Sequence, residues 1–422
     1  MKQVPGGVTA PKGFTASGVH CGVKKGKGDG NQPPTSKMPE VLEGKKDLAL
    51  IVSEQPCAAA AVYTMNRVKA APLYVTMDHL ENGEAQAIVA NSGNANACAP
   101  NSHEHAEEMC ALAARATGLK PSDFVVASTG VIGQTLNIAA IRAGMPEAAA
   151  GLTAGPEGSD AAANAIMTTD TVKKELSVTC LVGGKTVTIG AIAKGSGMIH
   201  PNMGTMLCFV TTDCAITHEL LAEALHEIVP RTFNRVTVDG DTSTNDMCVV
   251  LANGMAGNAL LEWKDDGYTV FYKTLYGVFE QLARNIAADG EGAGKLITGT
   301  VRGARSEESA ERLGKAVVGS SLVKAAMFGS DANWGRVLCA MGYSKAPFRP
   351  EYVDVKFASA VGEVLVCRQG AGVDFDEALA KSILSQDEVV IDVDLHEGDH
   401  QATCWGCDLT YDYVKINGDY RT

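Results

Sequence analysis

The chain is predicted to be an α/β protein, because strand-like and helix-like segments alternate along a sequence rich enough in apolar residues for a large core. Short apolar runs alternate with alanine-rich helical stretches. Asp-Gly, Asn-Gly and Gly-Gly pairs punctuate these segments and indicate tight turns between them. The 422 residues are 45% hydrophobic and 20% charged, which argues against disorder.

The elements follow from these patterns in order. Strands are expected at residues 48–51, 87–89, 124–127, 186–193, 206–211, 247–252 and 389–395. Helices are expected at residues 103–117, 138–150, 218–229, 269–288 and 306–327, the last broken at Gly314 or Gly319. Length alone allows two or three domains.

Charge and hydropathy exclude several classes of partner. A formal net charge of -13 repels nucleic acid and anionic membranes. The sequence contains no run of eighteen apolar residues, and its amino terminus leads into no hydrophobic signal region. We therefore expect a cytoplasmic protein that binds neither nucleic acid nor membrane.

The twelve cysteines are scattered, several of them within apolar stretches, which favours reduced core thiols over a disulfide framework. Cys404 and Cys407 form the one Cys-x-x-Cys, but no second pair with metal spacing accompanies them. His103 and His105 flank Glu104 on a polar stretch with no partner cluster nearby in sequence. An ordinary strand and a solvated helix face explain these two motifs, so no metal or other cofactor is expected.

A glycine-rich segment at residues 194–212 runs through Gly204 and Thr205 into a strand-like apolar run. If the bond between these two residues is cut, Thr205 carries a hydroxyl nucleophile and, on the same residue, an α-amine with a pKa near ~7.7 to 8.0 that can serve as its base. Gly204 adds no side chain that would hinder attack on its own carbonyl. A tight turn ahead of a buried strand explains the same residues.

The segment resembles the self-cleavage segment of the ornithine acetyltransferase family, also called glutamate N-acetyltransferase, whose pattern is Lys-Gly-Ser-Gly-Met-Ile-x-Pro-Asn-Met-Ala-Thr-Met-Leu. This chain departs from that pattern at Gly204, where the family mostly has alanine. Both residues are small, so the site is kept while the efficiency of cleavage is left open. Further blocks similar to the family lie at residues 6–14, 91–98, 128–133, 239–246, 289–293, 331–336 and 417–422.

The resemblance implies a layered α/β sandwich with sheets packed between helices, of the N-terminal-nucleophile-like, ArgJ/DmpA type. It implies cleavage into residues 1–204 and residues 205–422, with Thr205 as the amino-terminal nucleophile of the second product. The two products are then expected to stay folded together in a heterotetramer of two α and two β chains.

Acyl transfer also requires donors for the oxyanion of the tetrahedral intermediate. Thr129 and Gly130 follow an apolar run, so the hydroxyl of the first and the backbone N–H of the second can emerge together at a strand end. The resemblance assigns the oxyanion hole to these two residues. From the residues alone, a strand-terminating turn is the favoured explanation.

An amino-acid substrate brings charged groups, so its pocket needs a cation and an anion. Lys194 follows an apolar run, and Glu291 lies between two glycines in a predicted turn. An exposed strand-end lysine and a solvated turn are the commoner fates of such residues. The resemblance assigns both to substrate binding. It assigns the same role to Thr168, Thr205, Asn417 and the terminal Thr422.

The implied reaction is a double displacement in which Thr205 takes the acetyl group of N-acetylornithine and passes it to glutamate. Acetyl-CoA as an additional acetyl donor is left open by the sequence. Two other classes compete with this interpretation. A self-processing aminopeptidase or amidase would use the same threonine with water as acceptor, and a binding or assembly protein would need no cleavage. An acetyltransferase of specialised metabolism, acting on related acetylated amino acids, is a further alternative.

Overall fold

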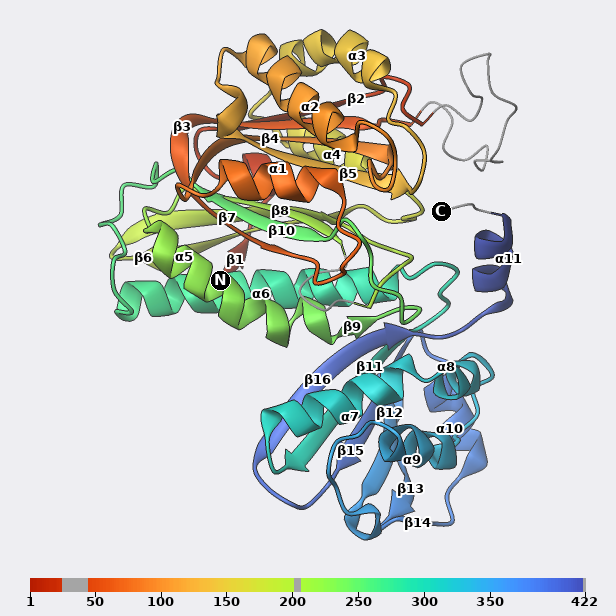
Figure 1. Cartoon of the computed structure of the whole chain (residues 1–422). Helices are drawn as coiled ribbons and strands as arrows, with labels where there is room; N and C mark the ends of the chain where they lie inside the picture. Colours follow the sequence, from red (N-terminus) through yellow and green to blue (C-terminus); the bar gives the residue numbers. More distant parts are fainter. Residues whose placement is uncertain (25–44, 201–205, 420–422) are drawn as a thin grey trace.

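The computed structural model describes residues 1–24, 45–200 and 206–419. Figure 1 shows two sheets, one above the other, each with helices packed against it. No helix in this described part is both long enough and apolar enough to cross a membrane. The expected α/β class is confirmed.

The first sheet has nine strands among the described residues, in the order β1-β6-β7-β8-β10-β3-β4-β5, with β2 paired to β3. It is mixed, because β10 runs parallel to β8 and β4 parallel to β5 while the other pairs are antiparallel. The strands are β1 (Lys2–Gln3), β2 (Phe14–Val19), β3 (Leu48–Tyr63), β4 (Glu84–Asn94), β5 (Phe124–Val131), β6 (Lys174–Val182), β7 (Lys185–Lys194), β8 (Leu207–Thr212) and β10 (Met247–Ala252).

Strand β3 divides the first sheet into two layers. Its first part pairs with β2 and β4, and its last six residues pair with β10, after a register shift between Val52 and Cys57. The two halves of the sheet share one buried core, to which β3 contributes Ile51 and β8 contributes Phe209, and α4 (Pro156–Ile166) packs into the same core. The sheet therefore folds over on itself.

Helices cover the outer faces of both layers. On one side α2 (Ser102–Thr117) and α3 (Ile138–Ala150) pack on β2 to β5, with α1 (Ala71–His79) beside β5. On the other side α5 (His218–Ile228) and α6 (Asp266–Ala288) pack on β6, β7, β8 and β10 (Figure 1). The resulting helix–sheet–sheet–helix order confirms the predicted layered sandwich.

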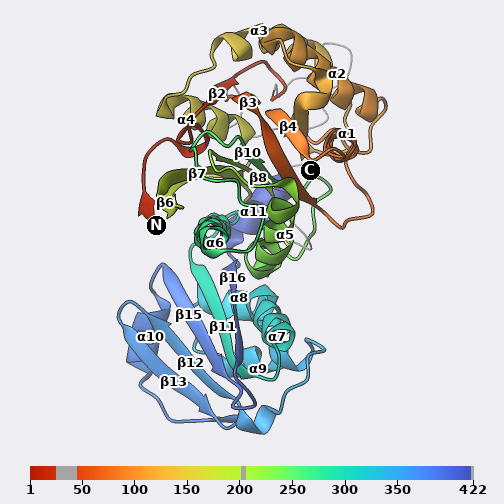
Figure 2. The same cartoon turned by 90° about the vertical axis from the view of Figure 1, so that its left-hand side faces the viewer.

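The second sheet has seven strands among the described residues, in the order β14-β13-β12-β15-β11-β16-β9. Figure 2 shows α6 end-on between this sheet and the first. The strands are β9 (Val236–Thr237), β11 (Leu296–Ala304), β12 (Asp354–Ser359), β13 (Gly362–Arg368), β14 (Ala371–Gly372), β15 (Glu388–Asp394) and β16 (His400–Cys407). Its helices are α7 (Glu307–Gly319), α8 (Ser321–Phe328), α9 (Trp334–Gly342) and α10 (Glu377–Leu384).

After β16 the chain turns back to the first sheet as α11 (Tyr411–Asp419), which brings the carboxyl-terminal segment beside elements from the first half of the chain (Figure 1). Short 3₁₀ helices lie at Gly7–Thr9, Pro121–Asp123, Val229–Arg231, Phe233–Arg235 and Pro350–Tyr352.

Each strand and helix expected from the sequence is present. Most ends shift little, but β3 continues to Tyr63, far beyond the expected strand at residues 48–51. The helix expected at residues 306–327 is two helices that part at Ser320, directly after Gly319, so the second of the two expected break points is confirmed. Ser320 caps α8, since its side chain accepts a hydrogen bond from the backbone N–H of Val323.

Candidate active site

A cavity of about 340 Å³ lies where β5 and β7 of the first sheet meet the Glu291 turn and α11. Six of the site residues expected from the sequence line this one cavity, although they come from both halves of the chain. They are Thr129, Gly130, Thr168, Lys194, Glu291 and Asn417.

Gly130 holds a backbone conformation that only glycine adopts without strain. Its φ is +132°, and it pairs with Gly93 of the neighbouring strand β4. A Cβ at position 130 would lie 2.4 Å from the backbone carbon of Gly93 and 2.5 Å from the nitrogen of Asn94. Because backbone atoms cannot yield as a side chain does, the end of β5 is built around glycine, and no side chain of residue 130 can block its N–H.

We expect Gly130→Ala to lower the free energy of unfolding by about 1–3 kcal/mol and the rate of acyl transfer by about 10²-fold. The added methyl group must push the end of β5, which carries the expected oxyanion hole, away from Gly93 and Asn94 of β4. Gly133→Ala is the matched control, since Gly133 also has a positive φ, +80°, but no atom lies within 4 Å of the added Cβ. Thermal unfolding and initial rates of both variants check this expectation, and equal effects would contradict it.

Lys194 lies at the end of β7 and is buried, contrary to the usual fate of a strand-end lysine. Its Nζ is 3.2 Å from the Thr129 hydroxyl oxygen. An ammonium has only donors, so the Thr129 oxygen must accept this hydrogen bond. The hydroxyl proton of Thr129 is therefore free to point at another acceptor, which is the arrangement that an oxyanion donor requires.

Burial is the largest influence on the Lys194 ammonium and lowers its pKa below the ordinary value. The positive charge of Lys174 acts in the same direction. The carboxylates of Asp170 and Glu291 oppose the shift, so the site partly compensates the buried charge.

Glu291 and Asn417 also line the cavity. The side chain of Glu291 is buried, so the solvated-turn interpretation of this residue is wrong. The Asn417 amide of α11 donates to Glu291 Oε2 at 2.8 Å. Gly197 faces the same carboxyl group, and a Cβ there would lie 2.2 Å from Glu291 Cδ. The absence of a side chain at position 197 therefore makes room for Glu291.

Thr168, which follows α4, is held at the cavity by a neighbouring carboxylate. Its backbone N–H donates to Asp170 Oδ2 at 3.0 Å. The cavity thus has the Lys194 ammonium, the Glu291 carboxylate and a threonine hydroxyl in its lining. Such a set complements a small ligand that carries both a positive and a negative group.

The sequence did not single out several residues that build this site. Asn245 lines the cavity, and its amide donates to the backbone oxygens of Ala95 at 2.6 Å and Ser128 at 2.8 Å. It therefore holds the residue directly before Thr129. The sequence signal for Asn245 was the block at residues 239–246, which is similar to the family. The spacing of residues in this block did not assign a role to any of them.

Asp239 and Tyr413 are two further residues of the cavity lining that the sequence did not single out. Asp239 accepts hydrogen bonds from the backbone N–H groups of Met198 at 2.6 Å and Ile199 at 2.9 Å, so it holds the chain that leads to residue 200. Burial raises the pKa of the Tyr413 phenol, which hydrogen-bonds to Asp239 and so ties α11 to this chain.

Gly204, Thr205 and Thr422 lie outside the described residues. Met206, the residue bonded to Thr205, lines a second small cavity together with Thr129, Lys194 and Asn245. In the β7–β8 ladder, Leu207 pairs with Lys194. The described chain therefore resumes beside the expected oxyanion residue.

Neither motif considered for metal binding forms a site. Cys404 and Cys407 belong to β16, and they are buried in two different hydrophobic cores. The residues from His103 to Glu107 lie in the first turns of α2, where His103 is half exposed and lies 3.6 Å from Glu107. In the described ranges, no group of three or more His, Cys, Asp or Glu side chains is arranged to hold a metal ion.

Residues 36–422 match the model of the ArgJ family. A protein of Symbiobacterium thermophilum called arginine biosynthesis bifunctional protein ArgJ is 54% identical and covers 100% of both chains. The arginine biosynthesis bifunctional protein ArgJ 1 of Clostridium acetobutylicum is 49% identical over 97% of this chain and 96% of its own. The crystal structure of ornithine acetyltransferase complexed with ornithine from Mycobacterium tuberculosis is 36% identical and covers 47% of this chain and 95% of that chain, with a TM-score of 0.40.

Proposed function

The chain belongs to the ArgJ family of arginine biosynthesis and is an acyltransferase, and from this we propose that it moves the acetyl group of N2-acetylornithine to glutamate. We further propose that it does so in the cytoplasm as a heterotetramer of two α and two β chains. One observation carries the proposal: the expected oxyanion donors and a buried pair of opposite charges line one cavity, beside the chain that follows Thr205.

The first step of this proposal is self-cleavage. The Thr205 hydroxyl attacks the Gly204 carbonyl carbon, the peptide C–N bond breaks, and the acyl group moves from nitrogen to oxygen as an ester. Water then hydrolyses the ester, which leaves a carboxylate on Gly204 and a free amine and hydroxyl on Thr205. The products are residues 1–204 and 205–422.

The sheet topology supports continued association of these two products. Strand β8, from the second product, lies between β7 of the first product and β10, and β10 in turn pairs with β3 of the first product. Separating the products would break two ladders inside one sheet and expose its core. We therefore expect them to purify together.

Acetyl transfer then uses the new amino terminus. The Thr205 α-amine takes the hydroxyl proton as the oxygen attacks the acetyl carbonyl of N-acetylornithine, and the oxyanion accepts hydrogen bonds from the Thr129 hydroxyl and the Gly130 N–H. Collapse of the intermediate breaks the amide bond, and the proton leaves with the amine of ornithine. An acetyl ester remains on Thr205.

Glutamate completes the cycle by entering the same cavity with its α-amine uncharged. That amine attacks the ester carbonyl, the C–O bond to Thr205 breaks, and the amine proton returns to the threonine oxygen. Both substrates are α-amino acids, so Lys194 and Glu291 serve as contacts for both, together with Thr168, Asn417 and the terminal Thr422. Acetyl-CoA as an alternative donor would enter at the first step.

The test is a steady-state assay with N-acetylornithine and glutamate varied together. We expect N-acetylglutamate to form and double-reciprocal plots to give parallel lines, because an acetyl-enzyme separates the two half-reactions. Intersecting lines would contradict a free acetyl-enzyme. Release of ornithine and acetate at the same rate without glutamate would instead identify a hydrolase.

A further inference from the structure

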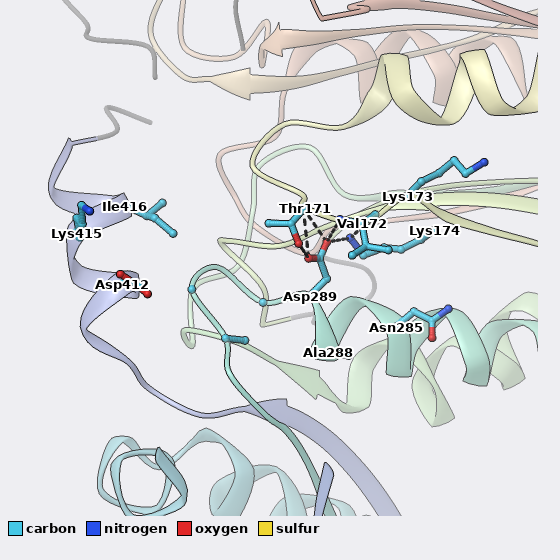
Figure 3. A pocket seen from close by; sticks show the side chains of 13 residues that line it. Thr171, Val172, Lys173, Lys174, Asn285, Ala288, Asp289, Asp412, Lys415 and Ile416 are labelled. Carbon is cyan, nitrogen blue, oxygen red and sulfur yellow. Dashed lines mark hydrogen bonds and ion pairs between the residues drawn. The ribbon is translucent and has the colours of Figure 1, made fainter. Parts of the chain in front are cut away.

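A buried ionic cluster is hydrogen-bonded to residues beside the substrate cavity, and the reaction steps above do not use it. The Lys174 ammonium is 2.7 Å from Asp170 Oδ1 and 2.5 Å from Asp289 Oδ2. Its third hydrogen bond goes to the backbone oxygen of Val172 at 3.2 Å, so all three donors are used. Figure 3 shows Lys174 and Thr171 converging on Asp289.

The burial of this cluster shows that it is not an ordinary surface ion pair. The side chains of Lys174, Asp170 and Asp289 are 1%, 0% and 7% exposed. Removing charged groups from water is costly, and such a set persists only where each charge is paired and hydrogen-bonded. Burial alone would raise the pKa of Asp170, but the charges of Lys174 and Lys194 and hydrogen bonds from Lys174 and Gly195 lower it overall.

Asp170 connects the cluster to two of the expected substrate contacts. Its Oδ2 accepts the backbone N–H of Thr168 at 3.0 Å. Its Oδ1 accepts the N–H of Gly195, the residue directly after Lys194, at 2.7 Å. A shift of this carboxylate would therefore move both Thr168 and Lys194.

Asp289 connects the cluster to the third contact. Its carboxylate accepts the N–H groups of Thr171 and Val172, and its backbone oxygen accepts the Ser196 hydroxyl at 2.7 Å. The backbone oxygen of Ser196 in turn accepts the N–H of Glu291 at 3.0 Å. Glu291 is thus positioned through the residue that lies two places after Lys194.

We propose that Lys174 is a positioning residue, which holds Thr168, Lys194 and Glu291 in register around the substrate by bridging Asp170 and Asp289. The inference rests on the proposed function, because the three contacts are assigned to the amino-acid substrates there. Lys174 and Asp170 belong to residues 1–204 and Asp289 to residues 205–422, so the cluster also fixes one product relative to the other.

The expected consequence is specific to binding. Lys174→Met leaves two neighbouring buried carboxylates without their shared cation, so both must move or take up a proton. The contacts then shift for the donor and for the acceptor alike. We expect kcat/KM to fall by about 10²-fold for both N-acetylornithine and glutamate, chiefly through KM, since small displacements of positioning groups have effects of that size.

Lys173→Met is the matched control. Lys173 is the neighbouring lysine. Like Lys174, it lines another cavity, of about 690 Å³, but its ion pairs are with Asp160 and Glu175. We expect this variant to keep the KM of the wild type for both substrates. Thermal unfolding reports correct folding in both variants, because self-cleavage uses the Thr129 hydroxyl, which Lys194 contacts.

The wild type is assayed first, because a wild type that neither cleaves nor transfers acetyl groups would overturn the proposed function itself. If the wild type is active, cleaved Lys174→Met with an unchanged KM for both substrates overturns the positioning role. Equal effects of Lys173→Met and Lys174→Met overturn it as well. Should Lys174→Met fail to fold, Asp289→Asn, which keeps shape and removes one charge, decides by the same criterion.

Discussion

Thr205→Ala is expected to yield a single uncut chain with no acetyl-transfer activity, whereas the wild type yields two chains that meet between Gly204 and Thr205. The replacement removes the hydroxyl that we propose opens the peptide bond, and without cleavage the α-amine proposed as the base is not released. Loss of a nucleophile of this kind lowers turnover by about 10⁴-fold or more. Intact-protein mass spectrometry of both proteins measures the cut, and the two wild-type masses should add up to the mass of an uncut wild-type chain plus one water.

Two controls make this result specific. Thr205→Ser keeps a hydroxyl at the same position, so we expect it to be cut and to retain measurable transfer. Gly204→Ala restores the residue that the resembled family pattern has before the threonine, and we expect it to be cut at least as completely as the wild type. Cleavage of Thr205→Ala at the same bond would show that another nucleophile acts there.

The position of Met206 makes a large effect reasonable. Met206 is bonded to Thr205, and it lines a small cavity with Thr129 and Lys194. The described chain thus begins again in the same small cavity as the two side chains that the proposal requires.

The strands that the sequence predicted are those that apolar side chains dominate. The second half of β3 was missed because it contains Cys57 and four alanines before Val62, and alanine favours helices in isolation. Its pairing with β10 and β4 overrides that preference. The helix α11 was missed because the sequence shows no clear apolar stripe there, and its apolar residues Tyr411 and Val414 are exposed.

Residues of the candidate site could be predicted only where they lie in a recognisable sequence motif. Thr129, Lys194 and Glu291 belong to segments similar to the family, and all three line the cavity. The ion pair between Lys174 and Asp289 joins residues 115 positions apart, so no local sequence pattern predicts it. Long-range partners of this kind become visible only when the sheet has brought their strands together.

Replacing Lys194 is expected to be nearly as damaging as replacing the nucleophile, because in the proposed mechanism this ammonium contacts the substrate, and because it donates to the Thr129 hydroxyl oxygen. We expect Lys194→Met to lower kcat/KM for ornithine release from N-acetylornithine by about 10³-fold, comparable to the loss of one oxyanion donor together with a charged contact. Self-cleavage should slow as well, since it uses the same donors. Single-turnover rates measure the first effect, and the time course of chain cleavage measures the second.

The pH dependence of ornithine release should show the titration of two groups, the Thr205 α-amine and the Lys194 ammonium. The rate is expected to rise as the Thr205 α-amine loses its proton near pH ~7.7 to 8.0, because only the free amine acts as a base. Burial lowers the pKa of Lys194 below its ordinary 10.5, so the rate should fall at a lower pH than an exposed lysine would cause. A neutral Lys194 amine can accept the Thr129 proton, and that hydroxyl is then lost to the oxyanion.

Lys194→Arg separates the Lys194 charge from the other groups that titrate at high pH. A guanidinium stays charged throughout the measurable range, so the alkaline fall caused by Lys194 should disappear even though the larger side chain lowers the rate at every pH. The acid limb should be unchanged, because it belongs to the Thr205 amine. If the alkaline fall persists in Lys194→Arg with the same midpoint, the fall belongs to the substrate ammonium, and the polarity assigned to the Lys194–Thr129 hydrogen bond is wrong.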